Sequence, residues 1–147
     1  ELEQLMSERA TDMTIFYRRL ASLPSDSAEW LEHLQVCFYE PMQASNEIWP
    51  RWFAWLDKYC TRLTQNSMSE QERIAWMNAV NPCFVLRNYL SHQAIEKAEI
   101  GDYSMIEQLL QALENPYQED LIPASFMQKR PGWALNKAGC SMLSCSS

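Results

Sequence analysis

The chain has 147 residues, of which 47% are hydrophobic and 21% charged, and its formal net charge is -7. This length fits one domain with a real core, and the composition excludes an intrinsically disordered protein. The excess of acidic side chains repels phosphate backbones and anionic lipids, so we expect neither a nucleic-acid nor a membrane partner. No apolar run reaches the ~18 residues that cross a bilayer, and five cysteines without a Cys-x-x-Cys pair suit a reducing compartment.

Apolar residues spaced three and four apart predict helices in the first part of the chain. The first predicted helix covers residues 1 to about 23, and Pro24 ends it. A shorter helix begins at Ser27, whose hydroxyl would cap the next turn, and Pro41 marks its latest end.

Two further helices follow in chain order. One runs from about residue 46 to about residue 63 and tolerates Pro50 because that proline lies in the first turn. The other runs from residue 70 to about residue 80, since Ser69 and Glu72 have the spacing of a capping box.

A fifth helix is predicted to begin at Asn81 and Pro82, a strong cap followed by a residue that fits the first helical position. We expect its apolar stripe to run from Val85 to Ala98 and Gly101 to supply the left-handed stop. The residues that we expect to form this inward-facing stripe are Val85, Leu86, Tyr89, Leu90, Ile95 and Ala98.

The last predicted helix is capped by Asp102 or Ser104 and closed by Asn115 and Pro116. We expect its inward-facing residues to be Ile106, Leu109, Leu110 and Leu113. After that point the apolar periodicity stops. The sequence therefore predicts an all-α fold, a single helical domain of about five or six helices, with a helical body over residues 1–114 and an irregular, extended C-terminal tail over 115–147 that packs on it.

Three tryptophans in one predicted helix, Trp49, Trp52 and Trp55, favour a core over a peptide-binding groove, because their spacing is helical. They cannot all point the same way, so we expect at least one to face another domain or the tail. His33 and His92 lie far apart in the sequence and match no zinc-binding spacing, so we expect no metal site in this chain.

Two short features could carry chemistry. Arg87 and Asn88 interrupt an apolar helix, where a buried guanidinium needs a carboxylate or several carbonyls. A structural latch between helices is favoured over a ligand-binding role. Cys145 stands among small polar residues, where a thiol can meet another sulfur, and it is either a redox residue or an accidental free thiol.

Several sequence blocks carry a specific resemblance. They are NPCFVLRNYL at 81–90, QAIEKAEIGD at 93–102, NPY at 115–117, RPGW at 130–133 and SCSS at 144–147. Together they closely resemble the C-terminal region of the selenoprotein O family of pseudokinase-fold protein adenylyltransferases. Upstream segments at 11–14 and 52–56 are similar but less diagnostic.

The resemblance implies that the chain is the C-terminal part of a larger bacterial, cytoplasmic protein. The parent would have a kinase-like core that binds ATP with Mg²⁺ or Mn²⁺ and transfers AMP to Ser, Thr or Tyr hydroxyls of protein substrates. This chain has three glycines, and it has neither a glycine-rich phosphate loop nor an HRD or DFG motif. We therefore expect no catalytic residue and no cofactor in this chain. We expect its partner to be the kinase-like core of its own full-length chain. The alternative is a stand-alone helical protein-protein interaction module.

One residue role is implied by the family. Cys145 occupies the position of a family cysteine or selenocysteine that is implicated in redox control by pairing with a cysteine of the kinase-like core. Such a bond would restrict loops that move during turnover. Cys140 is outside this pattern, and a local bond between Cys140 and Cys145 would compete with the interdomain one.

Overall fold

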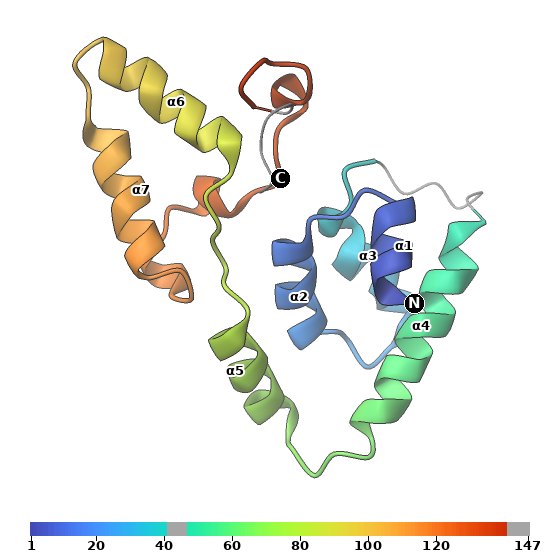
Figure 1. Ribbon diagram of the computed structural model, residues 1–147. Coiled ribbons are helices and arrows are strands. Elements are labelled where there is room, and N and C mark those ends of the chain that lie inside the picture. The colour runs from blue at the N-terminus through green and yellow to red at the C-terminus, as the bar shows by residue number, and fades with distance from the viewer. Residues whose placement is uncertain (41–46, 141–147) are drawn as a thin grey trace. The chain divides into compact units, whose positions relative to one another are not determined.

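The computed structural model describes residues 1–40 and 47–140. These residues form seven α-helices and several short 3₁₀ turns, with no β-strand among them, so the predicted all-α class is confirmed (Figure 1). The count exceeds the predicted five or six because the first predicted helix is broken in two. Compact packing divides the chain into two units between residues 79 and 80. This boundary differs from the predicted one between a body and a tail at residue 114.

The first unit contains the helices α1 to α5. Their bounds are Leu2–Glu8 for α1, Met13–Ala21 for α2, Trp30–Leu34 for α3, Ile48–Leu63 for α4 and Glu70–Val80 for α5, the last of which ends one residue beyond the unit. Two 3₁₀ turns, Ser27–Glu29 and Gln35–Cys37, flank α3.

The prediction of one continuous helix over residues 1–23 is wrong, because the backbone between α1 and α2 pairs with another segment. The amide of Asp12 donates to the carbonyl of Cys37 at 2.8 Å, and that of Tyr39 donates to Ala10 at 3.1 Å. The Asp12 carboxylate then accepts the amide of Ile15 at 3.0 Å and starts α2. An N-cap with extended dihedrals cannot lie inside a helix, so the helix restarts there.

Local capping explains the other boundaries of this unit. Asp26, and not the predicted Ser27, accepts the amide of Ala28 at 2.9 Å and opens the 3₁₀ turn before α3. The predicted capping box of α5 is confirmed, because the Ser69 amide donates to the Glu72 carboxylate at 2.8 Å and the Glu72 amide donates to the Ser69 hydroxyl at 3.3 Å.

Aromatic side chains fill the core of the first unit. The Trp52 ring is 1% exposed, with its centroid 5.5 Å from that of Phe16 and 5.3 Å from that of Phe38. Trp49 is buried in the same core, and Trp55 is partly buried at its edge, where it stacks on Tyr59. All three predicted tryptophans therefore pack in this core.

The second unit contains α6, Asn88–Glu99, and α7, Ser104–Glu114, which lie side by side (Figure 1). Gly101 has a φ of 85°, the predicted left-handed stop. The Asp102 carboxylate accepts the amide of Ser104 at 3.0 Å at the start of α7. Three 3₁₀ turns follow, Glu119–Leu121, Ala124–Met127 and Gly132–Leu135.

Helix α6 begins six residues later than the predicted start at Pro82. The amides of Cys83 and Phe84 both donate to the carbonyl of Pro116, at 2.8 and 3.2 Å, which holds this segment out of a helix. Arg87 is then the extended N-cap, with φ -87° and ψ 142°. Arg87 and Asn88 therefore stand at a helix start, and the prediction that they interrupt a helix is wrong.

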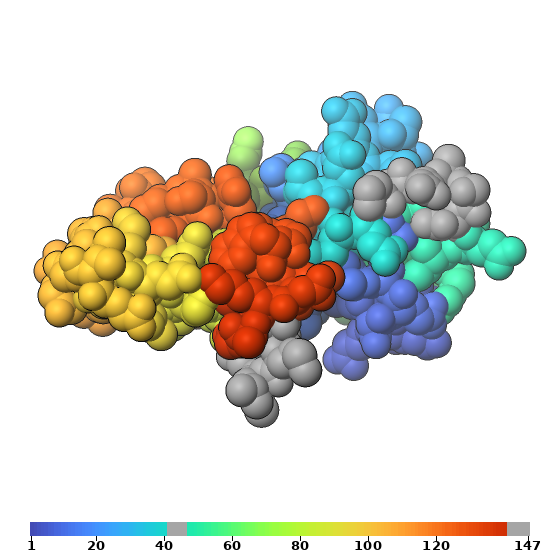
Figure 2. Space-filling model, turned by 90° about the horizontal axis from the view of Figure 1, so that it is seen from above, coloured from blue at the N-terminus to red at the C-terminus, as the bar shows by residue number. Residues whose placement is uncertain are grey.

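Several residues predicted to face inward on these two helices are exposed. Val85 and Leu86 precede α6, and the exposed fraction is 56% for Ile95 on α6 and 57% for Leu110 on α7. The core of the unit instead takes up part of the chain after Pro116, including Ile122, Phe126, Ala134 and Cys140. In the space-filling view the orange and red residues of this unit lie against its yellow residues (Figure 2).

Candidate functional site

The predicted latch residue Arg87 lies where the start of α6 meets the chain that follows α7. We call this place the tail junction and define it by Cys83, Phe84, Arg87, Tyr89, Pro116, Phe126 and Trp133. These residues come from the sequence blocks at 81–90, 115–117 and 130–133, together with Phe126. Three blocks that are distant in the sequence thus form one structural site.

Hydrogen bonds connect the two chain segments that meet at the tail junction. The Cys83 thiol donates to the Pro116 carbonyl at 3.2 Å, beside the two amide bonds to that oxygen. The Arg87 guanidinium, 8% exposed, donates from Nη1 to the carbonyl of Phe126 at 3.4 Å. A buried guanidinium engaged with backbone carbonyls has the geometry of a packing contact. Asn88 is the first residue of α6.

Aromatic contacts complete the tail junction. The ring centroids of Phe84 and Phe126 are 6.1 Å apart, and the Trp133 ring meets Tyr89 edge to face at 6.1 Å. Lys137 places its ammonium 5.5 Å from the centroid of the Trp133 ring and donates to the Glu96 carboxylate at 2.7 Å. These contacts hold the segment after Pro116 against α6.

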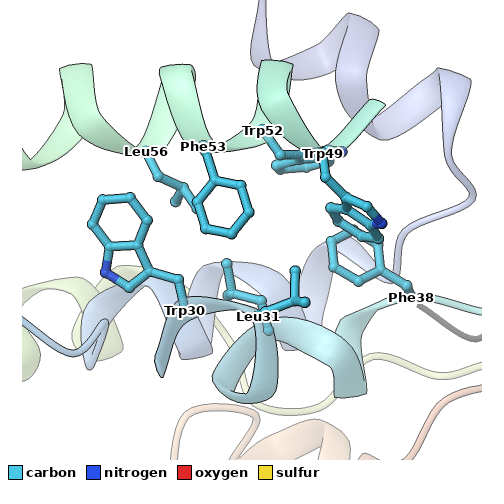
Figure 3. A pocket seen from close by; sticks show the side chains of 8 residues that line it. Trp30, Leu31, Phe38, Trp49, Trp52, Phe53 and Leu56 are labelled. Carbon is cyan, nitrogen blue, oxygen red and sulfur yellow. The ribbon is translucent and has the colours of Figure 1, made fainter. Parts of the chain in front are cut away.

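The aromatic stripe of α4 does not form a ligand-sized groove. Trp49, Trp52, Phe53 and Leu56 face residues of α3 across a narrow apolar gap (Figure 3). Its cavity volume is about 10 Å³, which is room for at most one water molecule, whereas ligand pockets have about 300 to 1,000 Å³. This stripe is therefore part of the core.

A wider depression of about 490 Å³ lies on the first unit, between the end of α2 and α3. It is open and polar, and the His33 ring at its edge pairs with the carbonyl of Arg19 at 2.8 Å. Its carboxylates, Glu29 and Glu32, are exposed. Among residues 1–40 and 47–140, no three His, Cys, Asp or Glu side chains are grouped so that they could hold a metal ion.

Sequence reasoning missed a second buried polar cluster, in the first unit. The Arg9 guanidinium, from a residue 6% exposed, lies 4.8 Å from the Trp49 ring centroid and donates to the Glu40 carbonyl at 3.0 Å. Asp12, also 6% exposed, accepts the hydroxyl of Tyr39 at 3.2 Å. The available signal was the helix-capping pattern of Asp12 directly before an apolar run.

Comparison of the sequence with known proteins identifies the family of this chain. A family model described as protein adenylyltransferase SelO matches residues 1–114. The chain belongs to the SelO/YdiU protein nucleotidyltransferase family. It is 43% identical to a protein nucleotidyltransferase YdiU of Flavobacterium johnsoniae and 44% identical to one of Tolumonas auensis, in each case over 99% of this chain. A YdiU protein of Aromatoleum aromaticum is 43% identical over the same share.

The relatives are much longer than this chain. The chain spans about 28% of the length of these YdiU relatives. The SelO family model covers the helices of both units, and the relatives also align with residues after 114, which include the second half of the tail junction. None of the helices that the structure describes is long and apolar enough to cross a membrane.

The structure describes one of the two candidate redox cysteines, Cys140. Cys145 lies outside the described residues. Cys140 is 1% exposed in the core of the second unit, and its amide donates to the carbonyl of Lys137 at 3.0 Å. A buried thiol reacts slowly with partners in solution, so any bond between Cys140 and Cys145 requires local opening of the chain around Cys140.

The ion pair at the edge of the tail junction leads to a pH prediction. The hydrogen bond from Lys137 lowers the pKa of Glu96 below its ordinary 4.5. A carboxylate with a depressed folded-state pKa stabilises the fold above its unfolded pKa, and this stabilisation is lost as the pH falls through the lower, folded value. We expect carboxyl NMR titration to find the Glu96 pKa below 4.5 and Lys137→Ala to return it toward 4.5. Lys58→Ala, which affects a pair in the first unit, is the control and should leave the Glu96 pKa unchanged.

Proposed function

We propose that this chain is the C-terminal helical domain of a protein adenylyltransferase, in which it supports the kinase-like core of its own longer polypeptide. The proposal is supported by the family match over residues 1–114 and by relatives that are about three and a half times as long, since this chain spans about 28% of them. The reaction joins the α-phosphate of ATP to a Ser, Thr or Tyr hydroxyl of a protein substrate, releasing pyrophosphate and the hydroxyl proton.

ATP and its Mg²⁺ or Mn²⁺ ion belong, in this proposal, to the part of the polypeptide outside these 147 residues. A phosphotransfer-type site holds the nucleotide with a flexible phosphate loop, a lysine and metal-binding carboxylates. The sequence here contains three glycines, and it has neither a glycine-rich phosphate loop nor an HRD or DFG motif. The domain therefore acts on catalysis through the position of the core and not through contact with the nucleotide.

The tail junction is the latch of this domain in the proposal. Arg87, together with Asn88 at the start of α6, joins the helix pair to the chain after Pro116, through the guanidinium bond to Phe126. This contact would give the end of the chain a defined starting point from which Cys145 reaches the core. A thiol on a tethered segment meets its partner at a higher effective concentration than a free thiol does.

We further propose that Cys145 is a redox residue that pairs with a cysteine of the kinase-like core. A small disulfide such as oxidised glutathione supplies the oxidising equivalents. One thiolate attacks it and releases one glutathione, and the second thiolate then displaces the other, so that two thiols become one disulfide by exchange. The resulting bond would restrain the core and lower its turnover.

Thiol labelling tests the difference among the cysteines. In the folded, reduced chain we expect iodoacetamide to modify Cys145 first. Cys37, Cys83 and Cys140 should react slowest because they are 0%, 5% and 1% exposed. Cys60 should react at an intermediate rate, since burial raises the pKa of its thiol. Peptide mass spectrometry gives the order, and a Cys145 that reacts as slowly as Cys37 and Cys83 would contradict the redox role.

Transfer of label from ATP tests the activity. The full-length protein is incubated with Mg²⁺ or Mn²⁺ and ATP labelled on either the α- or the γ-phosphate, in the presence of a heat-inactivated cell extract as a source of protein substrates. We expect label from the α-phosphate to become bound to protein hydroxyls and none from the γ-phosphate. Label from the γ-phosphate alone would indicate a kinase and would overturn the proposed function.

A further inference from the structure

Helix α7 carries two rows of apolar side chains, and only one of the two rows is buried in the second unit. Met105, Leu109 and Ala112 are 6%, 6% and 0% exposed and form the buried side. A second row, Ile106, Leu110 and Leu113, is 44%, 57% and 43% exposed. At about 100° of rotation per residue, this second row is centred about 100° around the helix from the first.

An exposed tyrosine lies close to each end of this helix. Tyr103 before it is 61% exposed and Tyr117 after it is 47% exposed. We call the five residues Tyr103, Ile106, Leu110, Leu113 and Tyr117 the outer stripe. Single exposed apolar residues are ordinary, but five large ones that recur every three or four positions are typical of a face that meets a partner.

The charges around the outer stripe decide between possible occupants. Glu107 and Glu114 lie on α7 itself, and Glu119 and Asp120 follow it. No Lys or Arg occurs in the sequence between Lys97 and Lys129. Two copies of the chain docked stripe to stripe would bring these carboxylates together, and like charges across an interface oppose binding. A second copy is therefore the weaker candidate.

We infer that the outer stripe docks on an apolar surface bordered by Lys or Arg side chains, located in the part of the longer polypeptide outside these 147 residues. This inference rests on the proposed function, because it takes the chain to be one domain of a longer enzyme. The length of polypeptide outside this chain, judged from relatives of which it spans about 28%, is sufficient to supply such a surface. Apolar contact would provide the affinity, and the acidic border would fix the orientation.

Hydroxyl-radical footprinting of the full-length protein tests the inference without a mutation. The rates at Tyr103, Ile106 and Leu110 are compared with the rate at Ile95, which is 56% exposed on α6 and lies outside the outer stripe. We expect the stripe residues to react at least about fivefold more slowly than their exposed fractions imply, because core positions of an interface lose nearly all solvent contact. Rates in proportion to the exposed fractions of these side chains would overturn the inference.

Matched substitutions provide the second readout. In the full-length protein, Ile106→Gln is compared with Ile95→Gln, the same change at a similarly exposed position of α6. We expect Ile106→Gln to raise the footprinting rates of Tyr103 and Leu110 at least about threefold, since an unpaired amide in an apolar interface weakens docking. Ile95→Gln should leave them unchanged. Equal effects of the two substitutions would overturn the assignment of the stripe.

The oligomeric state and the transfer assay separate this inference from its rivals. Protection that disappears on dilution, together with a dimer in sedimentation velocity, would identify a second copy as the occupant and overturn the inference. Protection in a monomer without transfer of labelled AMP would support the docking face and reject the proposed function. Transfer of labelled AMP with an unprotected stripe would support the proposed function and overturn the docking face.

Discussion

Replacing Trp52 with alanine is expected to lower the free energy of unfolding of the first unit by about 3 to 5 kcal/mol. The side chain is 1% exposed and packs against Phe16 and Phe38 at ring-centroid distances of 5.5 and 5.3 Å. Removal of the Trp52 side chain deletes a large buried surface and leaves a cavity that the surrounding helices cannot close. Urea unfolding followed by circular dichroism measures the change.

Trp76→Ala is the matched control for this prediction. Trp76 lies on α5, in the same unit, and is 71% exposed, so the same substitution there removes little buried surface. We expect a change within about 0.5 kcal/mol. Similar losses at Trp52 and Trp76 would contradict the division of the aromatic residues into core and surface.

The second large effect is expected for Arg87→Ala, which should release the chain after Pro116 from α6. The guanidinium bond to the Phe126 carbonyl is buried, and a hydrogen bond from a charged group contributes about 1.5 to 3 kcal/mol. Amide exchange of Phe126 and Ala134, whose amides close 3₁₀ turns with Pro123 and Pro131, should accelerate roughly tenfold or more.

Two controls make the Arg87 experiment specific. Arg87→Lys keeps a positive charge and donors at this position, so it should restore part of the protection. Arg62→Ala removes an exposed guanidinium on α4 in the other unit and should leave exchange at Phe126 unchanged. Unaltered exchange at Phe126 and Ala134 in Arg87→Ala would refute the latch role of the tail junction.

Local signals predicted the helices with strong caps. Ser69 with Glu72, and Gly101, act through contacts within a few residues, so the pattern alone locates them. The break between α1 and α2 and the late start of α6 depend on segments more than about 20 residues away. The Asp12 amide donates to the Cys37 carbonyl, and the Cys83 amide donates to the Pro116 carbonyl. Such long-range pairing has no local pattern, so the sequence predicted continuous helix in both places.

The same limit applies to the candidate site. Arg87 could be identified as a buried charge in need of carbonyls, but its partner Phe126 could not, because the helix stops at Gly101 and Pro116 do not indicate where the chain after Pro116 packs. The apolar periodicity of α7 correctly predicted a helix. It predicted Ile106, Leu110 and Leu113 to face inward, because periodicity identifies apolar positions and does not say whether the cover comes from the same unit.

Binding of ATP decides whether this chain is the supporting domain of an adenylyltransferase whose nucleotide site lies elsewhere. Isothermal titration calorimetry with ATP and Mg²⁺ or Mn²⁺ is carried out on the full-length protein and on the 147-residue chain. We expect saturable binding by the full-length protein and no heat of binding with the 147-residue chain. Saturable binding of ATP by the 147-residue chain, or none by the full-length protein, would contradict this assignment.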